Sequence, residues 1–524
     1  MSTRSYEDAI DALNSLQSNA ATLDAVRASG GTLSTLAIPE MLEYLGRIGY
    51  RPEDLNALNV IHITGTKGKG STSAFTDSVL RHAKPEWKVG LYTSPHLVAV
   101  RERIRINGRP LPEEDFTKFF FEIWDRLQEN TTRQHENTSL MPGYFRFLTL
   151  LAFHTFLALK VDATVLEVGV GGTYDSTNIV PKPIVTGITA LGIDHVFVLG
   201  KTLKEIAWQK GGIYKEGVPA LTVNQPEEGM TVLKQRAEEL KASEFVVTPL
   251  VPELAEIKLG RYHSVFRHFS ILRAYYAVAG LAGKHQVQNA TLAVHLAKYF
   301  LHAQASLNDT ESLPETFKAG LEKTKWPGRC QTVVDPLHNR TSWYLDGAHT
   351  VESLECCIQW FVSPGVALSS EPPTLKPARR VLIFNCTSGR SGGSFLTGVN
   401  ATANAQLKLY GLEEAGKDLF SHVIFCTNVT YASGKFKGDL TAVAIPESDL
   451  AELKTQHLLA DAWSSILPDF PKDNIHVLPS IEHAIKVVRD LEKDESEAVD
   501  VLVTGSLHLI GGVIEVAGLS DVAL

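Results

Sequence analysis

The sequence predicts two α/β domains, each built on a doubly wound and mostly parallel sheet. Short β-branched stretches alternate with stretches of helical periodicity along most of the chain. Several of the short stretches are apolar at nearly every position, as strands buried on both faces tend to be. The alternation restarts after the Pro327–Gly328 pair, which indicates a second domain. A βαβα order favours a parallel sheet covered by helices.

The first expected strand, Asn59–Thr64, leads into a glycine-rich loop and a helix that carries Phe75, Val79 and Leu80 at helical spacing. Further strands are expected at residues 88–94, 161–169 and 183–192. The long apolar run that starts at Phe145 contains charged residues and falls short of the ~20 residues needed to cross a bilayer. It is therefore expected to be a buried core helix.

Beyond the Pro-Gly pair, strands are expected in "SWYLDGAH", "RRVLIFNC", "SHVIFCTN" and "AVDVLVTG". We therefore expect an N-terminal domain over residues 1–325, a linker over 326–330 and a smaller, Rossmann-like C-terminal domain over 331–524.

Composition narrows the class of protein. The chain has 524 residues, of which 44% are hydrophobic and 21% charged, as in ordinary globular proteins. A formal net charge of -9 disfavours general binding to nucleic acid or anionic membranes. The 5 cysteines form no CxxC pair or Cys/His cluster, which favours a reducing compartment and no zinc site. The acidic N-terminus resembles neither a secretory signal nor a mitochondrial transit peptide.

The stretch "ITGTKGKGSTSAF", Ile63 to Phe75, has the context of a phosphate-binding loop, because a strand precedes it and a helix follows. Its glycines let backbone N–H groups turn inward, Lys69 can reach phosphates, and the hydroxyl of Ser71 or Thr72 can touch magnesium. The loop departs from the common G-x-x-x-x-G-K-[ST] pattern, since Gly70 follows Lys69. The alternative is a flexible turn with solvated lysines. The first domain is accordingly expected to be P-loop ATPase-like.

Seven motifs in order resemble folylpolyglutamate synthase, within the wider family of ATP-dependent Mur-type ligases. They are "GTKGKGS", "YTSPHL", "LEVGVGGTYDSTN", "AWQKGGI", "WPGRCQ", "YLDGAHT" and "VTGSLHLIGG". Lys67, Gln209 and Thr350 depart from bacterial relatives and resemble the eukaryotic branch. The resemblance implies a ligase that adds L-glutamate in γ-linkage to folate or its polyglutamates. ATP is split to ADP and phosphate through an acyl phosphate.

The resemblance, with the residues themselves, gives a set of candidate site residues. Glu167 ends a strand, where a carboxylate suits magnesium, although a capping or surface carboxylate is the alternative. His195 alone would be a hydrogen-bonded histidine, and Ser94 alone a turn residue. Lys210 matches a lysine that is carbamylated in some relatives, and an unmodified lysine is the alternative. The ATP contacts are expected to be Gly65, Thr66, Lys67, Gly68, Lys69, Gly70, Ser71, Arg329 and Asp346; the magnesium ligands Ser94, Glu167 and His195; and the catalytic residues Lys69, Lys210 and His349.

Two further groups are weaker candidates. If extended, the stretch from Arg101 would place Arg101, Arg103 and Arg105 on one face, as a basic patch for an anionic folate tail or as a solvated strand face. Asp346 could equally be a β-turn aspartate bonded to local backbone. By resemblance, the folate side includes Thr93, Pro95 and His96, and the basic patch adds Arg101 and Arg103. Ser506 and His508 are candidates for the glutamate side and could also simply pack.

The expected substrates are therefore ATP, L-glutamate and tetrahydrofolate polyglutamates, with Mg²⁺ and an allowance for K⁺. A monomer without nucleic-acid partners or stable membrane insertion is expected in the cytoplasm, with the mitochondrial matrix or inner membrane as a second location. Dihydrofolate synthase, which adds the first glutamate to dihydropteroate, is the close alternative. A P-loop nucleotide switch or motor without ligase activity is the alternative from another class.

Overall fold

The computed structural model describes residues 4–18, 36–134, 138–255, 281, 285–305, 312–368, 378–386, 392–412, 419–440, 450–493 and 497–524. They divide into two compact units. The N-terminal unit runs to Lys325. The C-terminal unit runs from Trp326 and also includes the short segment His96–Val100, together with Leu281.

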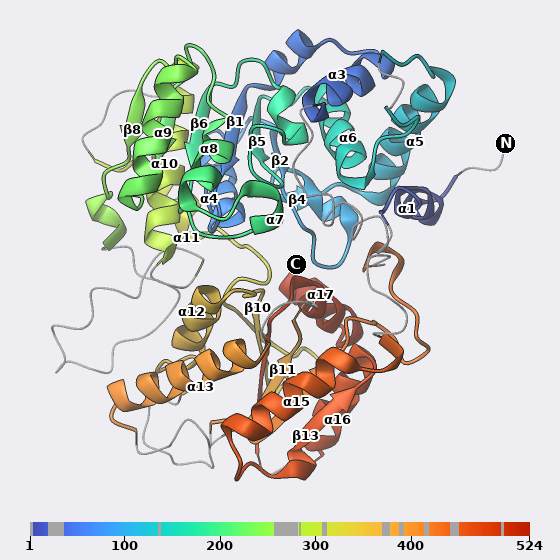
Figure 1. The fold of residues 1–524 in the computed structure, drawn as a ribbon, viewed down its shortest axis with the longest axis vertical. Helices are drawn as coiled ribbons and strands as arrows, with labels where there is room; N and C mark the ends of the chain where they lie inside the picture. The colour runs from blue at the N-terminus through green and yellow to red at the C-terminus, as the bar shows by residue number, and fades with distance from the viewer. Residues whose placement is uncertain are drawn as a thin grey trace. The chain divides into compact units, whose positions relative to one another are not determined.

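The N-terminal unit, coloured blue to yellow-green in Figure 1, contains an eight-stranded sheet within its described residues. The strand order is β4-β3-β2-β5-β1-β6-β7-β8. The pairs from β2 to β8 are parallel, whereas β3 and β4 add an antiparallel edge. The strands are β1 (Val60–Thr64), β2 (Val89–Tyr92), β3 (Ile104–Ile106), β4 (Arg109–Pro110), β5 (Ala163–Glu167), β6 (Val185–Ile188), β7 (Ala220–Thr222) and β8 (Phe245–Val247).

Helices cover both faces of this sheet. Successive residues of a strand point to opposite faces, so neighbouring residues of one strand pack against different helices. Gly187 of β6 lies against Leu296 of α10, whereas Ile188 belongs to a core cluster with Leu203 of α8 and Leu233 of α9. The α-helices are α1 (Tyr6–Asn14), α3 (Ala37–Arg47), α4 (Lys69–Ala83), α5 (Glu113–Glu129), α6 (Tyr144–Leu159), α7 (Val196–Leu199), α8 (Leu203–Gly211), α9 (Glu227–Glu239), α10 (His285–Ala303) and α11 (Glu315–Glu322). Shorter 3-10 turns are η1 (Pro52–Leu58), η2 (Val100–Arg103), η3 (Ser176–Ile179) and η4 (Pro252–Ala255).

The long apolar run from Phe145 forms α6, whose middle is buried, so the expected core helix is confirmed. Within the described part of the chain, no helix combines the length and apolarity that a membrane span requires.

The C-terminal unit, coloured yellow to red in Figure 1, contains a six-stranded sheet in its described residues, in the order β13-β12-β11-β14-β10-β9. All pairs are parallel except β9 with β10. The strands are β9 (Gln331–Val334), β10 (Thr341–Asp346), β11 (Arg379–Phe384), β12 (His422–Cys426), β13 (Ile475–Leu478) and β14 (Val499–Thr504).

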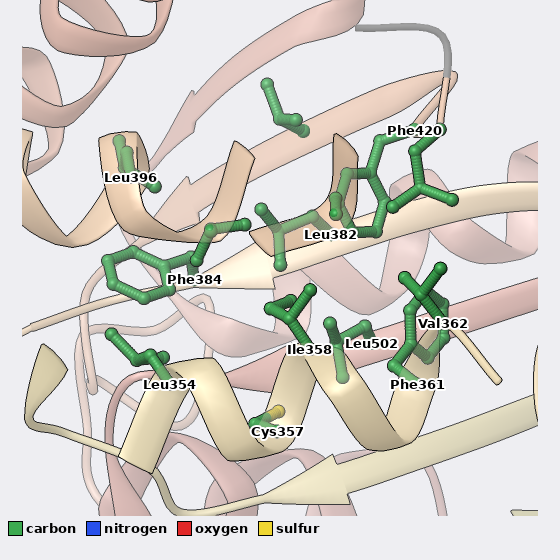
Figure 2. Close-up of a cluster of buried hydrophobic side chains, with 14 of the residues drawn as sticks. Leu354, Cys357, Ile358, Phe361, Val362, Leu382, Phe384, Leu396, Phe420 and Leu502 are labelled. Carbon is green, nitrogen blue, oxygen red and sulfur yellow. The ribbon is translucent and has the colours of Figure 1, made fainter. Parts of the chain in front are cut away.

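Two separate hydrophobic clusters, one on each face, make this second sheet doubly wound. Leu382 and Phe384 of β11 face one cluster with the helix α12, as Figure 2 shows, whereas Val381 and Ile383 face the other. Both sheets therefore confirm the predicted α/β class. The helices are α12 (Val351–Phe361), α13 (Gly392–Leu409), α15 (Lys454–Ile466), α16 (Ile481–Leu491), α17 (Leu507–Val516) and α18 (Ser520–Ala523), with 3-10 turns η7 (Gly438–Leu440) and η8 (Lys472–Asn474).

Candidate active site

The glycine-rich loop joins the carboxyl end of β1 to the start of α4 at Lys69 (Figure 1). Gly65 has φ +150° and Gly68 has φ +87°, both in a region that other residues rarely adopt. Close neighbours add a second constraint. A Cβ at Gly65 would lie 1.8 Å from Thr189 Oγ1, and one at Gly68 would lie 2.1 Å from Asn289 Oδ1. The loop therefore requires glycine at both positions for conformation and for space.

Two lysine side chains converge on one carbonyl inside this loop. Lys69 Nζ donates a hydrogen bond to the carbonyl oxygen of Gly65 at 3.0 Å, and Lys210 Nζ donates to the same oxygen at 2.7 Å. Lys69 belongs to the first turn of α4, where unpaired N–H groups carry partial positive charge. The positive charge of Lys69 and several N–H donors therefore gather at the loop, as binding of a polyphosphate requires.

Lys210 comes from the last turn of α8 and is only 3% exposed. Burial, followed by the positive charge of Lys69, lowers the pKa of Lys210 well below its ordinary value, and Asp194 and Asp175 oppose the change only in part. The fold thus favours the neutral amine at this position more than water does.

Residues distant in sequence pack around the glycine-rich loop and hydrogen-bond to it. Gln286 of α10 donates through Nε2 to Ser71 Oγ at 3.3 Å, and Asn289 Nδ2 donates to Gln286 Oε1 at 2.8 Å. The N–H groups of Thr66 and Lys67 both donate to the carbonyl of Ala190, two residues after the end of β6. No local sequence pattern links Gln286, Asn289 or Thr189 to the loop, so these residues were not among the predicted site residues.

A buried carboxylate lies at the end of the neighbouring strand. Glu167 ends β5, next to β1 in the sheet, and is 3% exposed. Its Oε2 accepts the N–H of Ser94 at 3.0 Å, so two of the three predicted magnesium ligands are adjacent. Among the described residues, no three His, Cys, Asp or Glu side chains gather as a metal cluster. One carboxylate beside a hydroxyl residue nevertheless fits magnesium, which commonly takes one or two carboxylates, phosphate oxygens and water.

The other predicted ligand, His195, follows β6. It has a left-handed backbone, caps α7 and keeps its side chain 48% exposed, with Nε2 lying 3.8 Å from Asp194 Oδ2. Its role as a magnesium ligand stays a prediction.

The turn after β5 is held by another buried acid. Asp175 accepts the N–H groups of Val170 and Thr177, each at 3.0 Å, and the hydroxyl of Thr177 at 2.6 Å. His62 Nε2 lies 2.9 Å from the same hydroxyl oxygen. This chain of contacts explains the polar "YDSTN" part of its motif, because it ties the strand-end turn to the centre of β1.

The predicted basic face from Arg101 is wrong. Val100–Arg103 forms a 3-10 turn, and only Ile104–Ile106 is extended. Arg105 is buried, donates to the carbonyls of Glu102 and Gly108, and lies 3.9 Å from the Glu102 carboxylate. Arg103 is also buried and lies over the Tyr144 ring at 5.6 Å. Arg103 and Arg105 are therefore buried against local partners and do not form an exposed row with Arg101.

The other residues predicted for the folate side do not lie together in one group. Arg101 donates to the carbonyl of Leu111 at 3.3 Å, and Thr93 donates its N–H to the carbonyl of Arg103 at 3.0 Å. Pro95 is exposed. His96 belongs to the C-terminal unit, where its Nε2 donates to the carbonyl of Asp439 at 2.8 Å.

In the C-terminal unit, Arg329 and Asp346 lie close together. Asp346 accepts the N–H of Cys330 at 2.7 Å and that of Ala348 at 3.0 Å. Arg329 Nη1 lies 2.6 Å from the ideal Cβ position of Gly347. The local backbone bonding considered for Asp346 is therefore present. The Arg329 side chain donates through Nη1 to the carbonyl of Gly328 at 3.0 Å.

His349 Nδ1 donates to the carbonyl of Gly347 at 2.8 Å. Ser506 caps α17 by accepting the N–H of Leu509, and Asn428 Nδ2 donates to the same hydroxyl at 3.4 Å. His508 is exposed on the first turn of α17. Ser506 therefore has a structural role as a cap, which satisfies one of the unpaired donors of a helix start.

The strand, glycine loop and helix, with a carboxylate on the adjacent strand end, define a nucleotide-binding α/β enzyme. The chain is 43% identical to a folylpolyglutamate synthase from Saccharomyces cerevisiae (strain AWRI796), over 99% of this chain and 88% of the relative. A relative from strain S288c has the same identity and coverage. The chain therefore belongs to the folylpolyglutamate synthase family. It matches no protein-family model.

Solved structures show the same fold. A folylpolyglutamate synthase from Mycobacterium tuberculosis, complexed with ADP and AMPPCP, has a TM-score of 0.64 at 22% identity, covering 93% of this chain and 96% of its own. An FPGS–AMPPCP–folate complex has a TM-score of 0.59 at 21% identity and covers 98% of this chain and 99% of its own. At these identities the likeness concerns the fold alone.

Proposed function

We infer that this chain is an ATP-dependent ligase that joins L-glutamate to folates. The observation that carries the inference is the phosphate loop, where glycines with positive φ, the start of α4 and two lysines gather beside Glu167. Full-length likeness to folylpolyglutamate synthases supports folate as the second substrate.

The chemistry explains why a ligase needs such a loop. A carboxylate is a poor electrophile, because it is anionic and stabilised by resonance. Transfer of the γ-phosphoryl group of ATP to the folate-bound glutamate gives an acyl phosphate, which the amine of free glutamate then attacks. Three anions must be held together, and preorganised N–H groups of the loop with Lys69 can offset their repulsion.

Glu167 and Ser94 are the residues that we propose would hold magnesium, with His195 as a further ligand by resemblance. Magnesium, when bound, would neutralise phosphate charge and orient the nucleotide. The chain's own contribution is to keep the Glu167 carboxylate buried and aligned by the N–H of Ser94.

Lys210 is proposed to act as a carbamate rather than as an ammonium. Carbamylation joins the neutral lysine amine to CO₂ and releases a proton, so a lowered pKa of the amine favours it. The product is an anion that could offset the charge of Lys69 and help to hold a second cation. An unmodified Lys210 would instead contact phosphate, and a K⁺ requirement belongs to the same proposal.

By resemblance, Arg329 and Asp346 are proposed to contact ATP, and His349 is proposed to take part in the reaction. Thr93 and Pro95 are proposed for the folate side, and Ser506 and His508 for the glutamate side. The working form is proposed to be a monomer.

The test is incubation of the protein with ATP, Mg²⁺, radiolabelled glutamate and either tetrahydrofolate monoglutamate or dihydropteroate, followed by mass spectrometry. A ladder spaced by one glutamyl unit on tetrahydrofolate is expected. Activity on dihydropteroate alone would make the chain a dihydrofolate synthase, and ADP release with unchanged folate would make it a nucleotide switch.

The Lys69→Ala variant should lose ligation while its circular dichroism and unfolding midpoint stay near those of the parent. Lys84→Ala, at the other end of α4, is the matched control and should remain active. Equal activity in both variants would remove Lys69 from the phosphate site.

A further inference from the structure

A five-residue segment of the chain, His96–Val100, is built into the core of the C-terminal unit. Leu97 and Val98 are 6% and 2% exposed and belong to the same hydrophobic cluster as Trp343 and Ile510. Gly511 of α17 makes room for the segment, since a Cβ there would lie 1.7 Å from the carbonyl oxygen of Leu97. The segment is therefore seated in that unit and not spread over its surface.

Asp439 fixes both ends of this segment. Its carboxylate Oδ1 accepts the N–H of Val100 at 2.7 Å, and its backbone carbonyl accepts from His96 Nε2 at 2.8 Å. A carbonyl can only accept, so His96 carries its proton on Nε2 in this contact. One residue of η7 thus holds the first and last residues of the segment.

The loop that carries Asp439 is itself anchored on α17. Lys437 Nζ lies 2.6 Å from one carboxylate oxygen of Glu515, and Tyr431 OH donates to the other oxygen at 3.2 Å. The N–H of Lys437 also donates to Thr430 Oγ1 at 3.2 Å. Asp439 therefore has a fixed support from the same helix that receives Leu97.

The residues that flank the segment are held in the N-terminal unit. On one side the N–H of Ser94 donates to Glu167 at 3.0 Å, and on the other Arg101 donates to the carbonyl of Leu111 at 3.3 Å. Ser94 and Leu97 are three residues apart, so the chain between them spans at most about 10 Å when extended. Movement of the seated segment would consequently pull on Ser94 and on its bond to Glu167.

We propose that Asp439 is a positioning residue for the ligase reaction, because it locks His96–Val100 and thereby aligns Ser94 with the Glu167 carboxylate. This role rests on the proposed function and adds to it a residue 272 positions after Glu167 (439 − 167).

The kinetic test compares Asp439→Ala with Asp439→Asn, whose amide oxygen can still accept the N–H of Val100. The alanine variant should lose at least tenfold in kcat at saturating ATP and glutamate, and need more Mg²⁺, while the asparagine variant recovers most of the rate. Glu497→Ala is the control, since it removes a carboxylate of the same unit that pairs with Arg379 at 2.9 Å, away from the loop that carries Asp439. Equal kcat in Asp439→Ala and Glu497→Ala would overturn the proposal.

A second test measures hydrogen exchange in the parent protein, so it depends neither on activity nor on the folding of a variant. In hydrogen exchange, the amide of Val100 should be protected. Its opening free energy should match that of amides in β10, β14 and α17 and differ from that of amides in β2. Exchange within seconds, as in an exposed loop, would overturn the proposal and leave the ligase assignment intact. Loss of the glutamyl ladder in the parent, with Val100 still protected, would instead overturn the proposed function.

Discussion

Replacement of Gly68 by alanine tests whether the phosphate loop is shaped by its neighbour as well as by its backbone. Gly68 has φ +87°, and the new Cβ would lie 2.1 Å from Asn289 Oδ1 and 2.8 Å from its Cγ. The left-handed conformation alone costs alanine about 1–2 kcal/mol. Asn289 must also turn away and give up its bond to Gln286, which adds about 1 kcal/mol or more. The variant should therefore lose about 2–4 kcal/mol of stability.

Equilibrium urea unfolding can separate the two contributions with matched variants. Gly217 has φ +72° and nothing within 4 Å of its ideal Cβ, so Gly217→Ala should show the backbone cost alone. In the Asn289→Ala background the obstacle is absent, and Gly68→Ala should then cost no more than Gly217→Ala. The coupling between positions 68 and 289 should thus be about 1–2 kcal/mol.

Two results would refute this reasoning. Gly68→Ala could cost no more than Gly217→Ala in the parent, or its cost could stay the same without Asn289, within about 0.5 kcal/mol. Either result would mean that the loop has room for a side chain, and that α10 does not shape it.

Three other predictions follow from single groups. Glu167→Gln should shift the Mg²⁺ dependence of ADP formation to higher concentration, and an unchanged titration would argue against a metal role. Lys210→Met should abolish ligation yet keep or raise the urea midpoint at pH 7, because a lysine with a lowered folded-state pKa costs stability below its unfolded pKa of about 10.4; a clearly lower midpoint would contradict this. Burial, then the nearby His476 and Arg379, lower the pKa of His422 to about 4, so its stability contribution is present above pH ~6.5 and lost as pH falls toward 4. His422→Phe should flatten that pH dependence of unfolding, and an identical slope in the variant would count against it.

Much of the fold could be predicted because its signals are local. β1, β5 and β6 are short runs rich in β-branched residues, and the glycines after β1 lie within a few residues of the helix start. A strand or a loop of this kind is specified by contiguous residues, through the backbone freedom of glycine and the preference of β-branched side chains for extended chain. The sequence by itself therefore determined where the phosphate loop lies and which elements surround it.

Only the tertiary structure decided what closes around the loop. Gln286 donates a hydrogen bond to Ser71, although 215 positions separate them in the sequence. The strand order places β5 and β6 on either side of β1. The arginines from Arg101 show the same limit, because their spacing suggested an exposed face whereas Arg105 is buried against Glu102. No local sequence pattern predicts that Leu97 packs in the hydrophobic core of the C-terminal unit either. Burial and partners depend on which distant segments pack together, and that free energy is a property of the whole fold and not of neighbouring residues.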